Sequence, residues 1–392
     1  LIIAQGEFTA DEDGATTDLD NPPIPVPHAY VSYGASDRLA AGVGLYVPYG
    51  LGTEWPADFE GSFLGYDNEL QSIYVQPTLA YRLTERIAVG AGLTGVVSGV
   101  ELNRRLDLSQ QPVTAPGLPE GTTFGALGVP FHTAFADARL RATGATGLGG
   151  HFGVQVAVND RIRLGARFLT PVELDYEGTA EFEQVPTGLT LPEDNPFGLP
   201  GGTSLDLLLE PFFTQGPLVE QDVETSITMP AQLVVGVSVQ ATERIQVLAD
   251  YQWTGWSAFD EVELDFEEEG LNQTLEENYN NTNGLRLGLE YAASEALALR
   301  AGFLTHEAAA PDETVTPLLP EAYRNEFTAG VGWRPTSSVG VDVAYQYIQQ
   351  NDRRGRVRDV LPGEENPTAE ELNSGLYSFN AHLIGATLTL HF

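Results

Sequence analysis

The sequence predicts an all-β protein, a 14-stranded antiparallel transmembrane β-barrel with short periplasmic turns and long extracellular loops. Three observations lead to this prediction. Side chains alternate in character with a period of two residues, which is the repeat of a β-strand. One set of alternate positions is aliphatic or aromatic, and the other mixes Gly, Ala, Ser, Thr, Gln, Arg and Asp. Short and long connections also alternate along the chain, as they do in bacterial outer-membrane barrels.

Residues 245–253 show the alternation clearly, because Ile, Val, Ala, Tyr and Trp take turns with Gln, Leu, Asp and Gln. A soluble all-β protein is the alternative, but its outer face would carry charge. Here the uniform face is apolar and the mixed face is small or polar, which is typical of a membrane barrel. Aromatic residues lie near the ends of the apolar faces, as interfacial girdles require; they are Tyr81, Trp253, Tyr291, Trp333, Tyr345 and Tyr347.

In chain order, the alternation predicts strands at about 1–9, 28–34, 37–48, 69–82, 86–104, 137–158, 160–183, 223–240, 243–266, 280–292, 295–307, 325–334, 338–351 and 376–392. Short turns rich in Gly, Asn, Asp, Ser, Thr and Pro are expected at 34–37, 83–85, 159–160, 241–242, 293–294 and 335–337. Long loops are expected at 10–27, 49–68, 105–136, 184–222, 267–279, 308–324 and 352–375. We therefore expect residues 1–392 to form a single barrel domain.

The composition excludes several classes of protein. The 392 residues contain no cysteine and no lysine, so all 19 basic residues are arginine, against 55 Asp and Glu and a net charge of −36. Without thiols there is no disulfide scaffold and no Cys-ligated metal site, and so strong a negative charge repels nucleic acid. No apolar run is long enough for a membrane helix. Residues 1–6 lack the basic region and cleavage site of a signal peptide.

Four phrases, in this order along the chain, carry a family resemblance: PVPHAYVSY at 25–33, DRLAAGVGLYVPYGL at 37–51, YQWTGWS at 251–257 and LRAGF at 299–303. Together with the strand count they resemble the FadL family of outer-membrane transporters for long-chain fatty acids and other hydrophobic compounds. The resemblance implies a channel, not an enzyme, that takes up such small molecules passively across the bacterial outer membrane, among its lipid and lipopolysaccharide. A final strand ending on Phe392 resembles the signal read by the outer-membrane assembly machinery.

The start of the sequence departs from the family pattern. Family members carry an N-terminal hatch that plugs the barrel and contains an Asn-Pro-Ala phrase, whereas the nearest phrase here is Asn-Pro-Pro at 21–23. Residues 1–8 look like the second half of the first strand. We therefore expect the hatch to be absent from this sequence, either because upstream residues are missing or because this is a hatchless member with an open lumen.

The resemblance implies that substrate is first captured in a groove between the third and fourth extracellular loops, 105–136 and 184–222. Apolar residues in these loops are candidates, since exposed apolar clusters usually mark binding sites. In the fourth loop they also match the spacing of one helix face. The alternative is that the two loops simply pack on each other and cap the barrel. The candidates are Phe124, Leu127, Phe131 and Phe135 in the third loop and Leu205, Leu208, Leu209 and Phe212 in the fourth.

Inside the barrel, the alternation turns four arginines toward the lumen: Arg163, Arg167, Arg286 and Arg300. Arginine could hold a fatty-acid carboxylate through two parallel hydrogen bonds. The alternative is a ladder of structural ion pairs with the interior acids Asp250, Glu290 and Asp342.

The family resemblance also implies a lateral exit through a break in an early strand. Pro48 is expected to end the third strand, and Pro77 lies within the fourth. Proline removes a hydrogen-bond donor from a sheet, so both residues are candidates for an opening. A plain strand end at Pro48 and a plain bulge at Pro77 are the alternatives.

Catalytic and cofactor motifs give no support to an enzyme. Gly90–Gly95 matches GxGxxG, but no helix follows it, and neither GxSxG nor HExxH occurs. No cofactor is expected, and the six histidines have no metal-ligand spacing. The acidic runs 11–13 and 267–269 could take Ca²⁺, but solvated loop charge is the simpler interpretation. Besides a transporter, a general diffusion porin, an outer-membrane lipase or a structural subunit of a surface complex would also fit a barrel.

The charge is concentrated in the predicted loops, which hold 31 of the 55 acidic residues but only 6 of the 19 arginines. Most of the negative field therefore faces the outside medium. Together with the absence of lysine, this indicates a halophilic source, where salt screens the repulsion between carboxylates. At low salt such a rim would repel an ionised fatty acid.

Overall fold

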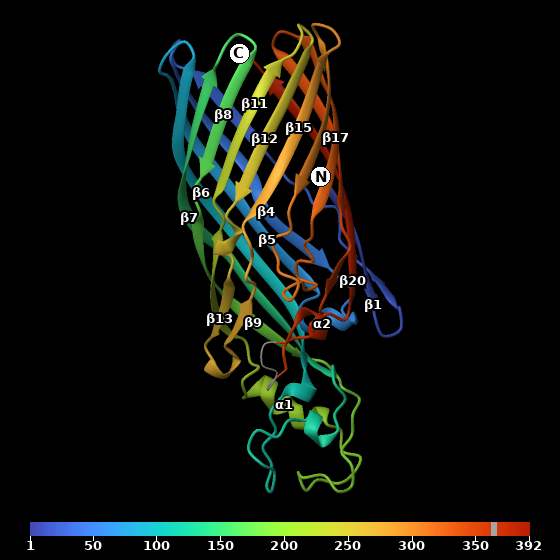
Figure 1. Cartoon of the computed structure of the whole chain (residues 1–392). Coiled ribbons are helices and arrows are strands. Elements are labelled where there is room, and N and C mark those ends of the chain that lie inside the picture. Colours follow the sequence, from blue (N-terminus) through green and yellow to red (C-terminus); the bar gives the residue numbers. More distant parts are fainter. Residues whose placement is uncertain (362–366) are drawn as a thin grey trace.

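The computed structural model describes residues 1–361 and 367–392 and is an all-β structure with few helices (Figure 1). Its 20 antiparallel strands are β1 (Ile2–Ala10), β2 (Thr16–Asp18), β3 (Ala29–Gly34), β4 (Leu39–Glu54), β5 (Asp67–Arg82), β6 (Ile87–Asp107), β7 (Ala134–Ala157), β8 (Ile162–Leu169), β9 (Val172–Gln184), β10 (Gln221–Met229), β11 (Gln232–Gln240), β12 (Ile245–Thr254), β13 (Glu261–Phe266), β14 (Gln273–Glu276), β15 (Thr282–Ala292), β16 (Leu297–His306), β17 (Arg324–Thr336), β18 (Val339–Gln350), β19 (Arg353–Gly355) and β20 (Gly375–Leu390). The helices are α1 (Asp206–Thr214), α2 (Ala369–Leu372) and five short 3₁₀ turns, η1 (Glu60–Phe63), η2 (Leu108–Gln110), η3 (Gly125–Leu127), η4 (Trp256–Ala258) and η5 (Glu269–Leu271).

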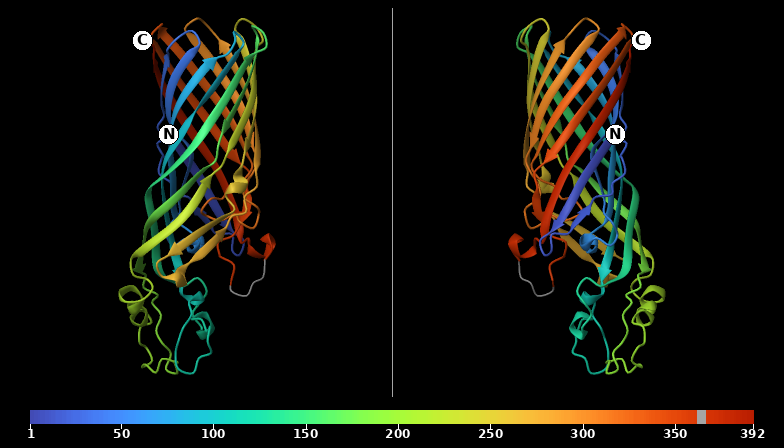
Figure 2. Two further views of the ribbon diagram at one scale, coloured as in Figure 1. Left: turned by 90° about the vertical axis from the view of Figure 1, so that its left-hand side faces the viewer. Right: turned by 90° about the vertical axis from the view of Figure 1, so that its right-hand side faces the viewer.

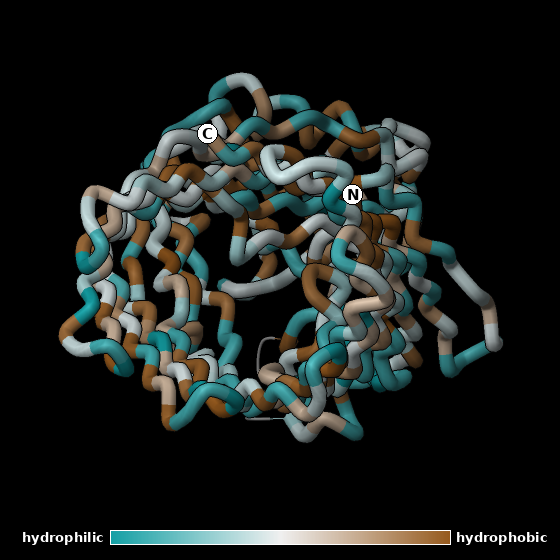
Figure 3. The backbone as a smooth tube through the Cα atoms, turned by 90° about the horizontal axis from the view of Figure 1, so that it is seen from above, coloured by the Kyte–Doolittle hydropathy of each residue, from teal (hydrophilic) through white to brown (hydrophobic). Residues whose placement is uncertain are grey.

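The long strands follow one another around a ring, as the view along the barrel axis shows (Figure 3). Their hydrogen-bonded order is β3, β4, β5, β6, β7, β8, β11, β12, β15, β16, β17, β18, β20 and β1. At one end, β9, β10 and β13 extend the wall beyond β7. Within the described residues no ladder joins β1 to β3, so the sheet is not closed by hydrogen bonds there.

The predicted number of 14 strands is not confirmed, because three predicted strands are each divided and three short strands lie in predicted loops. The predicted strand 160–183 is divided into β8 and β9 at Pro171, and 223–240 is divided into β10 and β11 at Pro230. Proline cannot donate a ladder hydrogen bond. The predicted strand 243–266 is divided into β12 and β13 by η4, and the short strands are β2, β14 and β19.

The two ends of the barrel differ (Figures 1 and 2). We call the end with the short connections, such as 83–86 and 293–296, the turn end, and the end with the long connections, such as 108–133 and 185–220, the loop end. Several strands run further into the loops than predicted: β4 continues to Glu54, and β7 begins at Ala134. Phe135, expected in the third loop, therefore belongs to a strand. Residues 362–366 of the predicted loop 352–375 lie outside the described residues. Among the described helices, none is long and apolar enough to cross a membrane.

Toward the turn end, the outward side chains of the strands are apolar. On β15, Leu285, Leu287 and Leu289 are 57%, 57% and 47% exposed, whereas Arg286 and Glu290 on the other face form ion pairs inside the barrel. The alternation therefore assigns the two faces correctly here. An apolar surface of this kind suits contact with lipid, and we take these parts of the strands as the membrane-spanning segments.

Toward the loop end, the pattern is reversed on three strands. β9, β10 and β13 bury mainly apolar side chains and expose acidic ones. On the continuous wall formed by β8 and β9 the even-numbered side chains point outward before Pro171 and inward after it, and β10 and β11 change phase in the same way at Pro230. The exposed acidic side chains of these strands make up what we call the acidic face: Glu173, Asp175, Glu177, Glu181, Glu183, Asp222, Glu224, Glu261, Glu263 and Asp265.

Candidate functional site

An apolar cavity of about 150 Å³ lies inside the barrel at the loop end, and we call it the loop-end cavity. Its wall comes from β4, β5, β6, β7, β10, β13 and β14 and from the segments around Glu277 and Leu318. Cavities of about this size lined by aliphatic and aromatic side chains can hold one benzene-sized molecule. The apolar lining includes Leu51, Leu70, Val100, Leu102, Leu140, Val223, Ile227, Phe259, Val262, Leu264, Leu275, Leu318 and Leu319.

Charged side chains are few in this cavity, whose uncharged polar lining includes Asn68, Thr225 and Thr316. Glu69, Glu101 and Arg141 contribute to the wall, but they occupy one cross-strand row, and Glu101 is held by Arg139 and Arg141, whose side chains are exposed. Because neighbouring residues on a strand point to opposite faces, this row faces outward while the rows of Leu70 and Leu102 face the cavity. Of the ionisable carboxyl groups lining the cavity, this leaves Glu277 on the inner side.

A layer of aromatic side chains fills the barrel next to the loop-end cavity, on its side toward the turn end. We call this layer the tyrosine constriction. The Tyr49 hydroxyl donates a hydrogen bond to the Pro230 carbonyl at 2.9 Å, and the Tyr176 hydroxyl lies 2.8 Å from the Ser98 hydroxyl. These bonds fix the rings across the lumen. The layer consists of Tyr46, Tyr49, Tyr74 and Tyr176 packed with Val96, Leu169, Val172, Leu174 and Met229.

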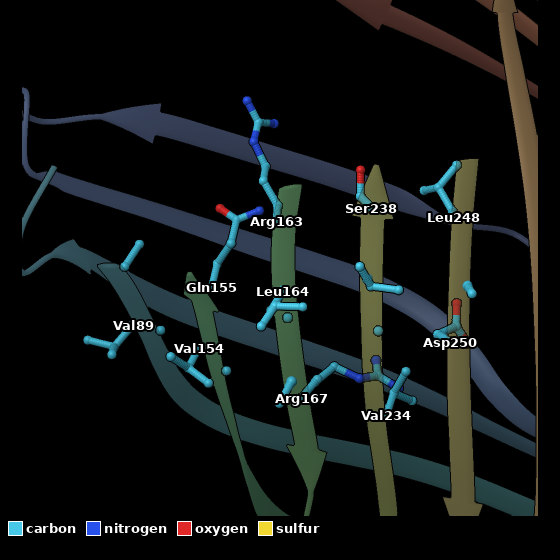
Figure 4. A pocket seen from close by; sticks show the side chains of 18 of the residues that line it. Val89, Val154, Gln155, Arg163, Leu164, Arg167, Val234, Ser238, Leu248 and Asp250 are labelled. Carbon is cyan, nitrogen blue, oxygen red and sulfur yellow. The ribbon is translucent and has the colours of Figure 1, made fainter. Parts of the chain in front are cut away.

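A larger cavity of about 670 Å³ follows toward the turn end, and we call it the turn-end cavity (Figure 4). Arg163 and Arg167 of β8 line it, as the alternation predicts. Arg167 Nη2 donates to Gln232 Oε1 at 3.0 Å, and within the described residues Arg163 has no ion pair. That either arginine holds the carboxylate of a ligand stays a prediction.

The other two predicted arginines are engaged in ion pairs. Arg286 Nη1 lies 3.7 Å from Asp250 Oδ1. Arg300 bridges two acids, with Nε 2.7 Å from Glu290 Oε2 and Nη1 2.5 Å from Asp342 Oδ1. These are the acidic partners that the sequence offered as the alternative to a ligand. Both guanidinium groups therefore already have carboxylate partners.

The third and fourth loops form a lobe beyond the strands at the loop end, which both side views show (Figure 2). The predicted helix is present as α1, which places Leu209 in the lobe interior next to Leu205, the residue that precedes the helix. Most candidate residues fill the lobe's own core: Phe124, Phe135, Leu205 and Leu209 are buried, and Leu208 and Phe212 pack against them.

Two of the candidates in the lobe keep an exposed apolar surface. Leu127 and Phe131 are 36% and 47% exposed. Phe131 stacks on His132 with ring centroids 4.0 Å apart, and Phe63 of the second loop stacks on the same imidazole at 4.3 Å. Burial lowers the pKa of His132. Capture of substrate by these residues is untested by this packing and stays a prediction.

The expectation that Pro48 ends its strand is wrong. β4 continues to Glu54, and its ladder with β5 shifts register between Tyr46 and Tyr49, which accommodates the proline. At Pro77 there is no register shift. The ladder between β5 and β6 runs from Val75 to Thr78 without a pair at the two residues between them.

The other edge of β4 is thinly covered next to this bulge. β3 pairs only with residues 40–45 of β4. Beyond the bulge, the Asn21 side chain donates to the Gly52 carbonyl at 2.6 Å and accepts from the Glu54 amide at 2.5 Å. Between these points the chain passes through residues 22–27, which include four prolines. Within the described residues no hydrogen bond joins this segment to β4, so this edge of β4 has no hydrogen-bonded neighbour there.

Sequence reasoning missed the tyrosine constriction and Glu277. Tyr176 follows the phase change at Pro171, so an unbroken alternation over 160–183 with Arg163 and Arg167 in the lumen would turn it outward. The proline within an otherwise regular strand was the available signal. Glu277 lies next to an acidic loop segment and resembles its solvated neighbours in sequence. Across residues 1–361 and 367–392, no group of three or more His, Asp or Glu residues could hold a metal ion.

Comparison with known proteins agrees with this architecture. The family model described as "Outer membrane protein transport protein (OMPP1/FadL/TodX)" matches residues 4–392. Outer membrane protein P1 of Haemophilus influenzae is 22% identical over 373 residues, which cover 94% of this chain and 75% of that protein. The long-chain fatty acid transport protein of Escherichia coli is 21% identical over 330 residues, covering 82% of this chain and 69% of that protein.

Solved structures show the same fold. A FadL homologue of Pseudomonas aeruginosa superposes with a TM-score of 0.77 at 17% identity, covering 99% of this chain and 88% of the other. The toluene transporter TodX of Pseudomonas putida superposes with a TM-score of 0.67 at 19% identity, covering 100% of this chain and 88% of the other. Because the family model spans nearly the whole sequence, this chain belongs to the OMPP1/FadL/TodX family of outer-membrane transport proteins and is a β-barrel of the bacterial outer membrane.

Proposed function

We propose that this chain is a passive channel that brings fatty acids or other hydrophobic small molecules across the outer membrane. The loop-end cavity carries the proposal, because an apolar chamber inside the barrel shelters a hydrophobic molecule from water. The names of its relatives support this substrate range, since one transports long-chain fatty acids and another toluene. No bond is made or broken along the path, so no enzymatic step is included.

Capture takes place at the lobe in this proposal, with the loop end facing the outside medium. The exposed apolar surface of Leu127 and Phe131 gives an incoming molecule a first contact that is larger than a single side chain. The lobe core beneath them is already filled, so capture occurs on its surface and the molecule then moves to the loop-end cavity.

Exit is lateral in this proposal, through the wall beside Pro48. Along β5, along β6, and along β10 followed by β11, the residues come in the order loop-end cavity, tyrosine constriction and turn-end cavity. The constriction therefore stands in the axial route. Tyr46 and Tyr49 flank Pro48, so the blocked lumen and the uncovered edge of β4 lie at the same level. Bilayer lipid and lipopolysaccharide surround the barrel there, and Phe392 is proposed as the contact for the assembly machinery.

Uptake by liposomes containing the purified protein tests the proposal. Val100 lines the loop-end cavity, so Val100→Phe should reduce uptake of labelled oleate and toluene to the level of empty vesicles. Val97 lies on the same strand but is 51% exposed on the outer face, so Val97→Phe is the matched control and should transport normally.

The result against the proposal is a folded V100F protein that transports both compounds as fast as the unmodified protein. Planar-bilayer recordings separate the transporter from a general diffusion porin. A porin would carry a large steady ion current, and because water-filled pores do not depend on an apolar chamber, V100F would leave that current unchanged.

A further inference from the structure

Glu277 is placed where an acidic side chain is unexpected. It follows β14, in which Leu275 pairs with Val262 inside the barrel and Glu276 pairs with the exposed Glu261. The next residue therefore returns to the inner side, and Glu277 lines the loop-end cavity together with Tyr279. Its backbone amide donates to the Asp260 carbonyl at 2.8 Å, which anchors the segment.

The carboxyl group of Glu277 has no partner of its own. Glu277 is half-buried, and within the described residues no hydrogen bond or ion pair reaches its oxygens, although a charge shielded from bulk water is normally paired. Arg356 is the cation that acts on it electrostatically, but the Arg356 guanidinium is directed to Asp359, with Nη1 3.7 Å from Oδ1. Burial raises the pKa of Glu277 to about 8. A carboxyl group thus faces an apolar chamber with its hydrogen-bonding capacity unused.

The negative charge on the outer surface near the cavity also favours cations over carboxylates. The acidic face carries carboxylates on β9, β10 and β13, and these same three strands carry no arginine. A negative potential raises the local concentration of cations and lowers that of anions. A positively charged hydrophobic molecule is therefore drawn to this end of the barrel, while a carboxylate is repelled both outside and inside.

We propose that Glu277 makes the loop-end cavity selective for small hydrophobic molecules with a hydrogen-bond-donating head, above all amines, and against ionised carboxylates. This inference rests on the proposed function and narrows its substrate range, so that ionised fatty acids enter the same cavity less readily than hydrophobic amines, alcohols and hydrocarbons. The apolar part of the ligand occupies the chamber lined by Leu102, Leu140 and Leu264. Its ammonium or hydroxyl group donates to the Glu277 carboxylate, which supplies the missing partner.

Three compounds that share one ring and differ only in the head group test the inference: benzylamine, benzyl alcohol and benzoate. Their binding to the detergent-solubilised full chain is measured by isothermal titration in mildly alkaline buffer. Benzylamine should bind most tightly and benzoate most weakly. Glu277→Gln should weaken benzylamine binding by roughly tenfold or more, because it leaves the ammonium group in the cavity without its charged partner. The same change should strengthen benzoate binding.

Glu276→Gln is the matched control, because it removes the same charge from the adjacent, outward-facing residue. Glu277→Asp keeps the charge and should retain the order of the three ligands. The inference is overturned if benzoate binds as tightly as benzylamine, or if E276Q changes the three affinities as much as E277Q does. If V100F blocks uptake but the ligands show no charge preference, only this inference fails. If V100F has no effect on uptake, the proposed function fails as well.

Discussion

The acidic face makes a direct prediction about salt and stability. Glu224 on β10 stands opposite Glu177 of β9 on one side and opposite Asp265 of β13 on the other. Like charges directly opposite each other destabilise a sheet. Replacing Glu224 by Gln removes both repulsions and keeps the shape of the side chain, so it should stabilise β10 when salt is low.

The size of the effect follows from Coulomb's law. Two unit charges about 6 Å apart in water repel by about 0.7 kcal/mol, so two such pairs give about 1.4 kcal/mol. This is a factor of about ten in the equilibrium constant for local opening. In 1 M salt the screening length falls to about 3 Å, which reduces the repulsion to about 0.2 kcal/mol. The stabilisation should therefore be nearly absent at high salt.

Hydrogen–deuterium exchange of peptides from β10 measures this local opening. At low ionic strength E224Q should slow exchange by roughly tenfold, and the difference should disappear in 1 M salt. Glu173→Gln is the control, because Glu173 lies on the same face but opposite Thr228. If E224Q and E173Q protect β10 equally, or if the effect survives high salt, the reasoning from opposed charges is refuted.

Three further predictions concern other parts of the barrel. A Cβ at Gly332 would lie 2.6 Å from Oδ1 of Asp342, the ion-pair partner of Arg300. Gly332→Ala should therefore cost about 1–3 kcal/mol of stability and lower the temperature at which the barrel unfolds in a gel-shift assay. A Cβ at Gly385 would meet nothing within 4 Å, so Gly385→Ala should leave that temperature unchanged. Burial raises the pKa of Glu277 from 4.5 to about 8, so between these values the folded state holds a proton that the unfolded chain releases. The stability to heat, measured by circular dichroism, should therefore fall as the pH rises through that range. E277Q should flatten this pH profile. A Cβ at Gly52 would lie 2.8 Å from the Ile24 side chain, so an oxidised Ile24→Cys, Gly52→Cys pair should slow transfer of substrate to the bilayer, reduction should restore it, and unchanged transfer in the oxidised form would argue against the lateral exit.

The lipid-facing wall could be predicted from the sequence because the bilayer imposes a simple rule on it. Leu285, Leu287 and Leu289 must be apolar where they meet lipid, so the two-residue period is visible locally. The partners of Arg286 and Arg300 could be predicted for a related reason. Interior acids on neighbouring strands are the nearest groups of opposite charge in a lumen where few other charges occur.

The loop end could not be predicted in the same way. From Pro171 toward the loop end the outer side chains are acidic and suit contact with water. The apolar and polar faces are therefore exchanged while the wall itself continues. A single irregular step changes the side on which each later residue points, and alternation alone does not show where that step lies. The loop-end cavity has no local signal at all, because its lining is assembled from segments as far apart as Leu51 and Leu319.

The reversal at Pro171 and Pro230 also determines how deeply the protein sits in its membrane. If the barrel moved so that its loop end entered the bilayer, the carboxylates of the acidic face would be buried in hydrocarbon. If it moved the other way, the outward leucines near the turn end, which form an apolar belt, would be exposed to water. Both changes cost free energy. The immersion depth is thus encoded within the wall itself. A bilayer thinner or thicker than the apolar belt must deform to match it. The two prolines mark the position of the membrane–water interface on the wall.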